Sequence, residues 1–200
     1  MLNQVEELNF YILDFGNSGL IPLNGLPHTA DYIAYDDVEK FEKFTKIIQE
    51  EITARKKLFA QKMVQNFNVY NQTNEEHLKS IVIVVDNFDV VRELGIDVEN
   101  FFTKLSRDGA SLGIYLIITA TRSGAVKYSI LNNFKLKISG VTFDQSEINS
   151  VVGRSAYKLP EIKGRALVKI SNVNIMQVYT MVSFEDDIEY NRNIKKLIGK

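Results

Sequence analysis

Three short apolar runs stand out along the first two thirds of the chain. They are rich in β-branched and aromatic residues and cover Leu8–Asp14, Ser80–Asp86 and Ile114–Thr121. Their hydrophobicity is nearly continuous rather than alternating, which is typical of parallel strands that are covered on both faces. We therefore expect three central strands of a parallel sheet.

Apolar residues at helical spacing separate these runs. The stretch from about Asp36 to Gln65 places one apolar residue every three or four positions, at Val38, Phe41, Phe44, Ile48 and Ile52. Asp36 or Asp37 is a plausible N-cap, and the Asn-rich segment Asn66–Asn74 is expected to be a loop. A second helix is expected to start at an Asp97 cap and to stop before Gly109, with a buried face formed by Val98, Phe101, Phe102 and Leu105.

Strands that alternate with helices predict an α/β fold with a mainly parallel central sheet and helices on both faces. Beyond Leu131 the elements become shorter. We expect a strand at Phe134–Ser139, a helix at Asp144–Val152 and a terminal antiparallel hairpin of Arg165–Ile170 and Ile175–Val182. The predicted organisation is one core, residues 1–184, followed by a charged helical tail, Glu185–Lys200.

Composition narrows the classes of partner and compartment. The net charge of −1 and the pI near 6.2 do not give the whole chain the positive field that non-specific binding to nucleic acid needs. The absence of cysteine excludes disulfides and thiolate metal sites. Residues 1–7 lack the features of a signal peptide, and no apolar run approaches the ~18 residues of a membrane span. We expect any membrane link to lie outside this chain.

The segment Ile81–Asp89 (IVIVVDNFD) has the pattern most indicative of chemistry. An apolar strand that ends in an aspartate is how P-loop ATPases present the carboxylate that holds magnesium, which would be Asp86 here. A glutamate that polarises the attacking water commonly follows, but this chain has Asn87, whose amide cannot accept a proton. An aspartate at a strand end is also a common turn residue.

The segment Ser106–Arg122 (SRDGASLGIYLIITATR) supplies the context for that strand. It resembles the pattern close to GRSLGIHLILATQRP that follows the Walker B strand in the FtsK/SpoIIIE superfamily of ATPases. Further matches follow in family order from about residue 8 to 182, at Leu8–Gly16, Leu26–His28, Arg55, Leu58–Phe59, Asn132–Asn133 and Lys163–Arg165.

Within this superfamily the chain most resembles the degenerate C-terminal module of the EssC/EccC coupling proteins of type VII secretion, a system linked to virulence. The resemblance implies a three-layer RecA-like P-loop NTPase fold in a larger, membrane-bound protein at the cytoplasmic face of a bacterial membrane. It implies that the module recruits the exported protein substrate, or its targeting segment, beside neighbouring ATPase modules. No nucleic acid is expected as a partner.

Departures from the family pattern argue against hydrolysis. No G-x-x-x-x-G-K-[ST] run occurs in the sequence, and in the family this loop precedes the strand that corresponds to Leu8–Asp14. Ala110 replaces the family arginine and Thr121 replaces the sensor glutamine, whereas Arg122 is kept. Because phosphoryl transfer depends on positioned charge, we expect no catalytic residue and no hydrolysis by this chain alone.

What remains is a vestigial nucleotide pocket of Asp86, Thr121 and Arg122, in which Asp86 would hold magnesium if any were bound. No cofactor is expected for this chain by itself, and ATP with magnesium is expected only in a complete module. Arg107, Arg122 and Arg154 are candidates to serve a neighbour's nucleotide in trans, and solvated or ion-paired arginines are the more ordinary interpretation.

Other polar motifs give weaker signals. His28 and His77 are the only histidines, too few for a metal site of the usual kind, and His28 is interpreted as a turn residue. Residues Gly16–Gly19 lack the spacing of a dinucleotide fingerprint and are predicted to be a loop.

Three functions are open at this point. The leading hypothesis is a degenerate ATPase module that binds an exported protein in an apolar groove, for which the candidate lining residues are Phe59, Phe67, Tyr70, Tyr128 and Tyr157. The second is an active ATP-binding motor whose P-loop was removed by truncation. The third is a DNA translocase, which the near-neutral charge disfavours.

Overall fold

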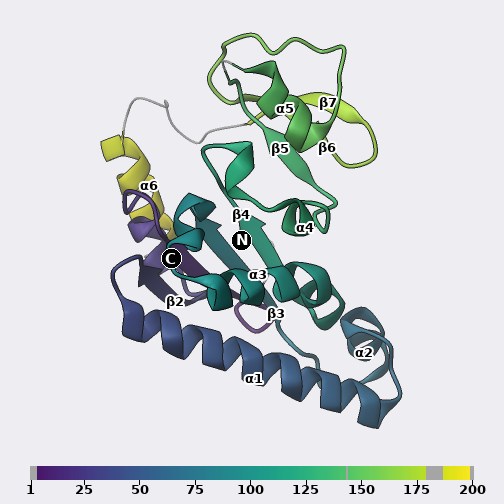
Figure 1. The fold of residues 1–200 in the computed structure, drawn as a ribbon. Helices are drawn as coiled ribbons and strands as arrows, with labels where there is room; N and C mark the ends of the chain where they lie inside the picture. Colours follow the sequence, from purple (N-terminus) through teal and green to yellow (C-terminus); the bar gives the residue numbers. More distant parts are fainter. Residues whose placement is uncertain (1–3, 143, 179–186, 199–200) are drawn as a thin grey trace. The chain divides into compact units, whose positions relative to one another are not determined.

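The computed structural model describes residues 4–142, 144–178 and 187–198, and the chain forms two compact units, residues 1–119 and 120–200. The first unit is built on a four-stranded parallel sheet (Figure 1). Its strands are β1 (Leu8–Asp14), β2 (Thr29–Ala34), β3 (Ser80–Asp86) and β4 (Ile114–Ile118), in the spatial order β2-β1-β3-β4.

The two central strands, β1 and β3, confirm their predicted bounds. Leu13 of β1 and Ile83 and Val85 of β3 are completely buried. The prediction for the third run was wrong in one respect, because β4 ends at Ile118 and lies at the edge of the sheet in the part of the chain that the structure describes. Half of the Ile117 side chain is exposed there. The sequence analysis also missed β2, a short edge strand without a continuous apolar run.

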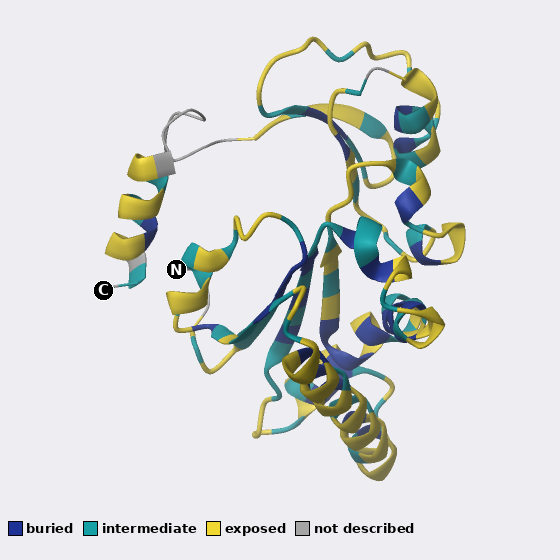
Figure 2. Ribbon diagram, turned by 60° about the vertical axis from the view of Figure 1, so that its left-hand side comes forward, coloured by how far each residue is buried: buried dark blue, intermediate teal, exposed yellow. Residues whose placement is uncertain are grey.

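Two helices pack against one face of this sheet. In α1 (Val38–Lys62), Asp37 is the N-cap and accepts a hydrogen bond from the Lys40 amide, as predicted. The Phe44 ring of α1 lies 5.4 Å from Tyr11 of β1 and 6.1 Å from Phe101 of α3 (Ile96–Asp108). The strands are therefore mostly buried or half-buried, whereas the outward side of α1 is exposed (Figure 2).

The start of α3 differs from the prediction. Gly95, at a φ of 101°, is the N-cap residue, and Asp97 lies within the first turn instead. A positive φ at this position suits glycine because it has no Cβ. Asp97 still stabilises the helix, since a carboxylate in the first turn interacts favourably with the helix dipole. The helix ends at Asp108 before Gly109, as expected.

The Asn-rich segment predicted as a loop is a helix, α2 (Phe67–Thr73). Asn66 caps it by accepting a hydrogen bond from the Val69 amide, and Phe67 and Tyr70 are buried. The prediction failed because the asparagine side chains suggested irregular structure, whereas one of them caps the helix. Short 3-10 segments complete the unit, namely η1 (Ile21–Gly25), η2 (Phe88–Arg92) and η3 (Gly109–Leu112).

Arg55 of α1 connects the ends of several elements. Only 3% of its surface is exposed, and each of its three guanidinium nitrogens donates a hydrogen bond. It donates to Glu51 Oε1 at 2.7 Å, to the Leu112 carbonyl at 2.6 Å and to the Lys79 carbonyl at 2.8 Å. It also lies 5.6 Å from the centre of the Phe67 ring. This residue holds α1, α2 and the amino ends of β3 and β4 together.

The second unit contains a three-stranded antiparallel sheet. Its strands are β5 (Lys137–Ser139), β6 (Arg165–Lys169) and β7 (Val173–Gln177). The helix α5 (Gln145–Val152) places Ile148 and Val152 against Leu167 of the sheet. Two short elements precede the sheet, η4 (Ser123–Ala125) and α4 (Tyr128–Leu131). The helix α5 and the antiparallel pairing of the hairpin confirm their predictions. The second hairpin strand begins at Val173 and not at the predicted Ile175, and the strand expected at Phe134–Ser139 forms only from Lys137.

The C-terminal region contains α6 (Asp187–Ile198), within the tail predicted to be helical. The predicted boundary between residues 184 and 185 lies outside the described residues, as do residues 179–182 of the second hairpin strand. The division into a core of residues 1–184 and a tail stays a prediction.

Candidate functional site at the carboxyl ends of the strands

Asp14 and Asp86 end two adjacent strands of the first unit, at the ends of the predicted runs Leu8–Asp14 and Ser80–Asp86. They are register partners at the carboxyl ends of β1 and β3. Ligands of open α/β sheets bind at this edge, so it is the place to look for a site. What each carboxylate contacts decides what chemistry the edge supports.

The Asp86 carboxylate is held by neighbouring residues of the sheet. Its Oδ1 accepts a hydrogen bond from Thr119 Oγ1 at 2.6 Å. Its Oδ2 lies so close to Gly16 that a Cβ at that position would come within 2.6 Å of the oxygen. Thr119 was not predicted from the sequence, because it follows β4 and reaches Asp86 only through the adjacency of β3 and β4. Asp86 thus serves partly as a connector between strand ends.

Asn87 follows Asp86, where the resemblance noted above leads us to expect a glutamate in an active ATPase. Its backbone is left-handed, with a φ of 58°, a conformation that asparagine tolerates better than most residues. The side-chain Nδ2 donates to the Phe15 carbonyl at 3.0 Å, and the backbone amide donates to Thr119 Oγ1 at 3.0 Å. A carboxylate has no hydrogen to donate to that carbonyl. Asn87 is therefore suited to fastening the ends of β1, β3 and β4 together.

Asp14 is more deeply buried than Asp86, with 2% of its surface exposed. Its Oδ2 accepts hydrogen bonds from the Leu20 amide at 2.9 Å and from the Tyr32 hydroxyl at 2.8 Å. Burial and the hydrogen bond to Asp14 raise the pKa of Tyr32 to about 12. Asp14 Oδ1 has no hydrogen-bond partner among the described residues. Asp14 thus stabilises the loop that follows β1. Residues 16–19, which were predicted to be a loop, lie within it.

The other predicted pocket residues lie in the second unit. Thr121 and Arg122 are exposed there, and each has an interaction with other parts of the chain. A pocket that joins them to Asp86 stays a prediction. Within the described residues, no group of three or more His, Asp or Glu side chains is arranged to hold a metal ion. Asp86 alone would offer a weak magnesium site.

Of the candidate arginines and histidines, only His28 is buried among the residues that the structure describes. Arg107 is exposed and donates to both carboxylate oxygens of Asp108, at 2.8 and 3.0 Å, and this contact lowers the pKa of Asp108. Arg154 is exposed. His28 lies in the turn before β2, as predicted, and its carbonyl accepts from the Phe10 amide, whereas His77 is exposed. Roles for the arginines in trans stay predictions.

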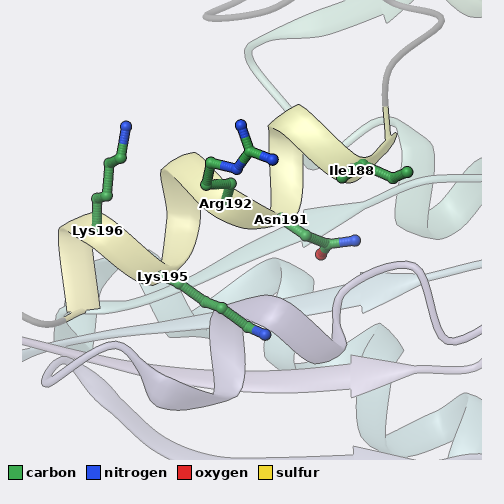
Figure 3. Close-up of a pocket in the computed structure, with 5 residues that line it drawn as sticks. All are labelled: Ile188, Asn191, Arg192, Lys195 and Lys196. Atoms are coloured by element: carbon green, nitrogen blue, oxygen red, sulfur yellow. The ribbon is translucent and has the colours of Figure 1, made fainter.

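The aromatic residues proposed for a groove fall into two groups. Phe59, Phe67 and Tyr70 are buried between α1 and α2, where Phe59 and Tyr70 stack at 5.6 Å. They are core residues and not groove residues. Tyr128 and Tyr157 of the second unit are exposed. A separate hollow of about 560 Å³ follows α6 and is lined by Ile188, Asn191, Arg192, Lys195 and Lys196 (Figure 3).

Within the described ranges, no helix combines the length and the apolar character that crossing a bilayer requires.

A family model described as the FtsK/SpoIIIE family matches residues 1–166. The chain is 46% identical over 190 residues to the ESX secretion system protein EccC of Geobacillus thermodenitrificans, which covers 95% of the chain and 13% of that relative. It is 45% identical over 199 residues to the ESX secretion system protein YukB of Bacillus subtilis, which covers 98% of the chain and 13% of YukB. The chain thus spans about an eighth of the length of these relatives.

The solved structures that match this chain also come from EssC and EccC proteins. The structure of ATPases 2 and 3 of EssC from Geobacillus thermodenitrificans matches with a TM-score of 0.93 at 44% identity, over 98% of this chain and 38% of that one. ATPases 2 and 3 of Thermomonospora curvata EccC, in complex with a signal sequence peptide, match with a TM-score of 0.82 at 20% identity, over 99% and 37%. The second likeness shows the fold alone. Together the matches establish a RecA-like P-loop ATPase fold.

Proposed function

Because the chain belongs to the FtsK/SpoIIIE family and is homologous to the type VII secretion ATPases EssC and EccC, we propose that it is a degenerate ATPase module that recognises exported protein and does not hydrolyse ATP by itself. The observation that carries the proposal is the bonding at the strand ends. Thr119 engages the Asp86 carboxylate, and Asn87 donates its amide to Phe15 where a catalytic base would be required. These bonds support a structural use of this edge, and the Asn87 amide would not supply the base that phosphoryl transfer uses.

Support for recognition of exported protein comes from the relatives. A structural neighbour was solved with a signal sequence peptide bound. The second unit of this chain exposes many large aliphatic side chains, among them Leu136, Ile138, Ile170 and Ile175. Exposed apolar surface of this kind suits the docking of a peptide. We place the module at the cytoplasmic face of the membrane, as part of a longer protein with further ATPase modules.

A titration tests the proposal. A fluorescently labelled peptide with the C-terminal sequence of a type VII substrate is added to the 200-residue chain, and anisotropy is followed with and without ATP and magnesium. We expect saturable binding at micromolar concentrations, unchanged by the nucleotide. A scrambled peptide of the same composition is the control. Absence of saturation at high micromolar concentrations contradicts the proposal.

A second candidate, nucleotide binding in a more complete module, is favoured by the open side of β4. In the hydrogen-bond pattern between β3 and β4, the Ile81 amide donates to the Gly113 carbonyl and the Thr119 amide donates to the Val85 carbonyl. The backbone groups of the odd-numbered residues of β4 therefore point toward β3. The N–H and C=O groups of Leu116 and Ile118 therefore point away, and no strand of the described residues pairs with them. Tyr115 and Ile117 are also exposed. This edge has room for a further strand.

Calorimetry separates the two candidates. ATP and magnesium are titrated into the 200-residue chain and into a form extended upstream in the parent protein. Heat of binding that appears only with the extension, and disappears with Asp86→Ala, favours the second candidate. Absence of heat in both forms contradicts the second candidate and leaves recognition of exported protein, without nucleotide binding, as the proposed function.

A further inference from the structure

The net charge of −1 conceals an unequal division of charge along the chain. Residues 1–119 contain 18 Asp and Glu against 11 Lys and Arg, a net charge of −7. Residues 120–178 contain 3 acidic residues against 9 basic ones, a net charge of +6. The remaining 22 residues are balanced, with four of each sign. The second unit up to β7 is therefore the strongly basic part of a nearly neutral chain.

Three of these cations converge at one end of α5. Lys137 of β5 and Lys169 of β6 are directly opposed cross-strand partners, so their side chains leave the same face of the sheet. Leu167, two residues before Lys169, lies on that face and packs under α5. Lys169 Nζ lies 3.3 Å from where a Cβ at Gly153 would be, at the C-cap of α5, and the exposed Arg154 follows. We call Lys137, Arg154 and Lys169 the basic strip.

The basic strip lacks matching carboxylates. Across the residues that the structure describes, none of its three members forms an ion pair. Asp144 caps the opposite end of α5, where hydrogen bonds from the hydroxyl and the amide of Ser146 lower its pKa. Like charges directly opposed on a sheet are destabilising. The C-terminal end of the α5 dipole offsets only part of this repulsion. A ligand with carboxylates at this place would relieve the remaining repulsion between the cations.

The neighbouring side chains favour a polypeptide over nucleic acid. Ile175 is 39% exposed and opposes Leu167 across β6 and β7, which places it on the face that Lys137 and Lys169 share. An aliphatic side chain on the same face as the cations suits the apolar residues of an amphipathic segment. The strands β5, β6 and β7 contain no aromatic residue on which a base could stack.

We propose that the basic strip binds a carboxylate-rich, amphipathic segment of a protein partner. This inference rests on the proposed function and adds the chemistry of the recognised segment: acidic residues face Lys137, Arg154 and Lys169, and aliphatic residues face Ile175. Charge complementarity of this kind raises the association rate and selects the partner.

Three probes and two charge-reversal variants test it. The probes are a helical peptide of about 20 residues with a leucine stripe and glutamates elsewhere, the same peptide with glutamine for glutamate, and a single-stranded DNA of matching length. The test variant is Lys137→Glu with Lys169→Glu, and the matched control is Lys43→Glu with Lys46→Glu, two exposed lysines of α1. The double variant Lys137→Gln with Lys169→Gln removes charge without reversing it, and circular dichroism establishes that each variant is folded.

We expect the glutamate peptide to bind at low salt and to bind about tenfold or more weakly to the strip variants, with the control variant unchanged. Equal affinity for the glutamate and glutamine peptides overturns the inference and leaves the proposed function intact. Tighter binding of DNA, weakened by the same variants, overturns it in favour of nucleic acid. If the substrate peptide binds but neither designed peptide does, the inference alone fails, whereas loss of substrate-peptide binding contradicts the proposed function.

Discussion

The two units of the chain differ in what their residues are used for. In the first, a parallel sheet is buried under phenylalanines from α1 and α3, and buried polar groups such as Arg55 and Asp14 bond to backbone atoms. In the second, short strands surround a small core of Ile148, Val152 and Leu167, while aliphatic side chains and cations are exposed. On the function proposed above, the first unit is a framework and the second presents the surface that a partner would contact.

Removing Arg55 should have the largest effect on the framework. Arg55→Ala leaves the carbonyls of Leu112 and Lys79 without their donor and opens space beside Phe67. We expect the free energy of unfolding to fall by about 4 kcal/mol. Urea unfolding followed by circular dichroism measures it, and Lys56→Ala, an exposed neighbour on α1, is the control. A loss no greater than that of the control would show that Arg55 is not a structural centre.

The second unit should respond independently of the first. Leu167→Ala creates a cavity under α5 in the small core and should cost about 3 kcal/mol. Because the two units are separate compact bodies, we expect hydrogen exchange to accelerate for β5, β6 and β7 while β1 and β3 stay protected. Exchange that accelerates equally in both sheets would mean that they unfold as one.

A smaller effect is expected at Gly113. Its φ of 75° disfavours a side chain, and a Cβ there would overlap the buried Phe67 ring. Gly113→Ala should therefore destabilise the first unit by about 2 kcal/mol. Gly19→Ala, where a Cβ meets nothing within 4 Å, is the matched control. The prediction is contradicted if Gly113→Ala and Gly19→Ala unfold at the same midpoint temperature.

The smallest effect concerns pH. The pKa of Tyr32 is raised from 10.0 to about 12, so the folded state holds the hydroxyl proton more tightly than the unfolded state does. The stabilisation is complete below pH 10 and is lost as pH rises from 10 to about 12. Tyrosinate absorbance is titrated against pH for the wild type and for Tyr32→Phe. The difference between the two titration curves reports the Tyr32 hydroxyl alone. A difference curve centred near pH 10 would contradict the hydrogen bond to Asp14.

Sequence patterns predicted the framework well and the site only in part. The apolar runs of β1 and β3 indicate strands, and the spacing from Phe41 to Ile48 indicates a helix. These elements were therefore predicted closely. The helix α2 was missed because its stability depends on Phe67 and Tyr70 reaching a core that other segments form. Thr119 was missed because its role depends on the adjacency of β3 and β4. The opposition of Lys137 and Lys169 likewise depends on strand register.

The most direct test of the account is phosphate release from ATP and magnesium by the purified chain, measured beside Asp86→Ala and Asn87→Glu. If Asp86 and Asn87 fasten strand ends and do not serve chemistry, all three proteins should release phosphate at the rate of buffer alone. Asn87→Glu should in addition be less stable by about 1 kcal/mol, because the donor to Phe15 is lost. Sustained release by the wild type that Asp86→Ala abolishes would contradict the account.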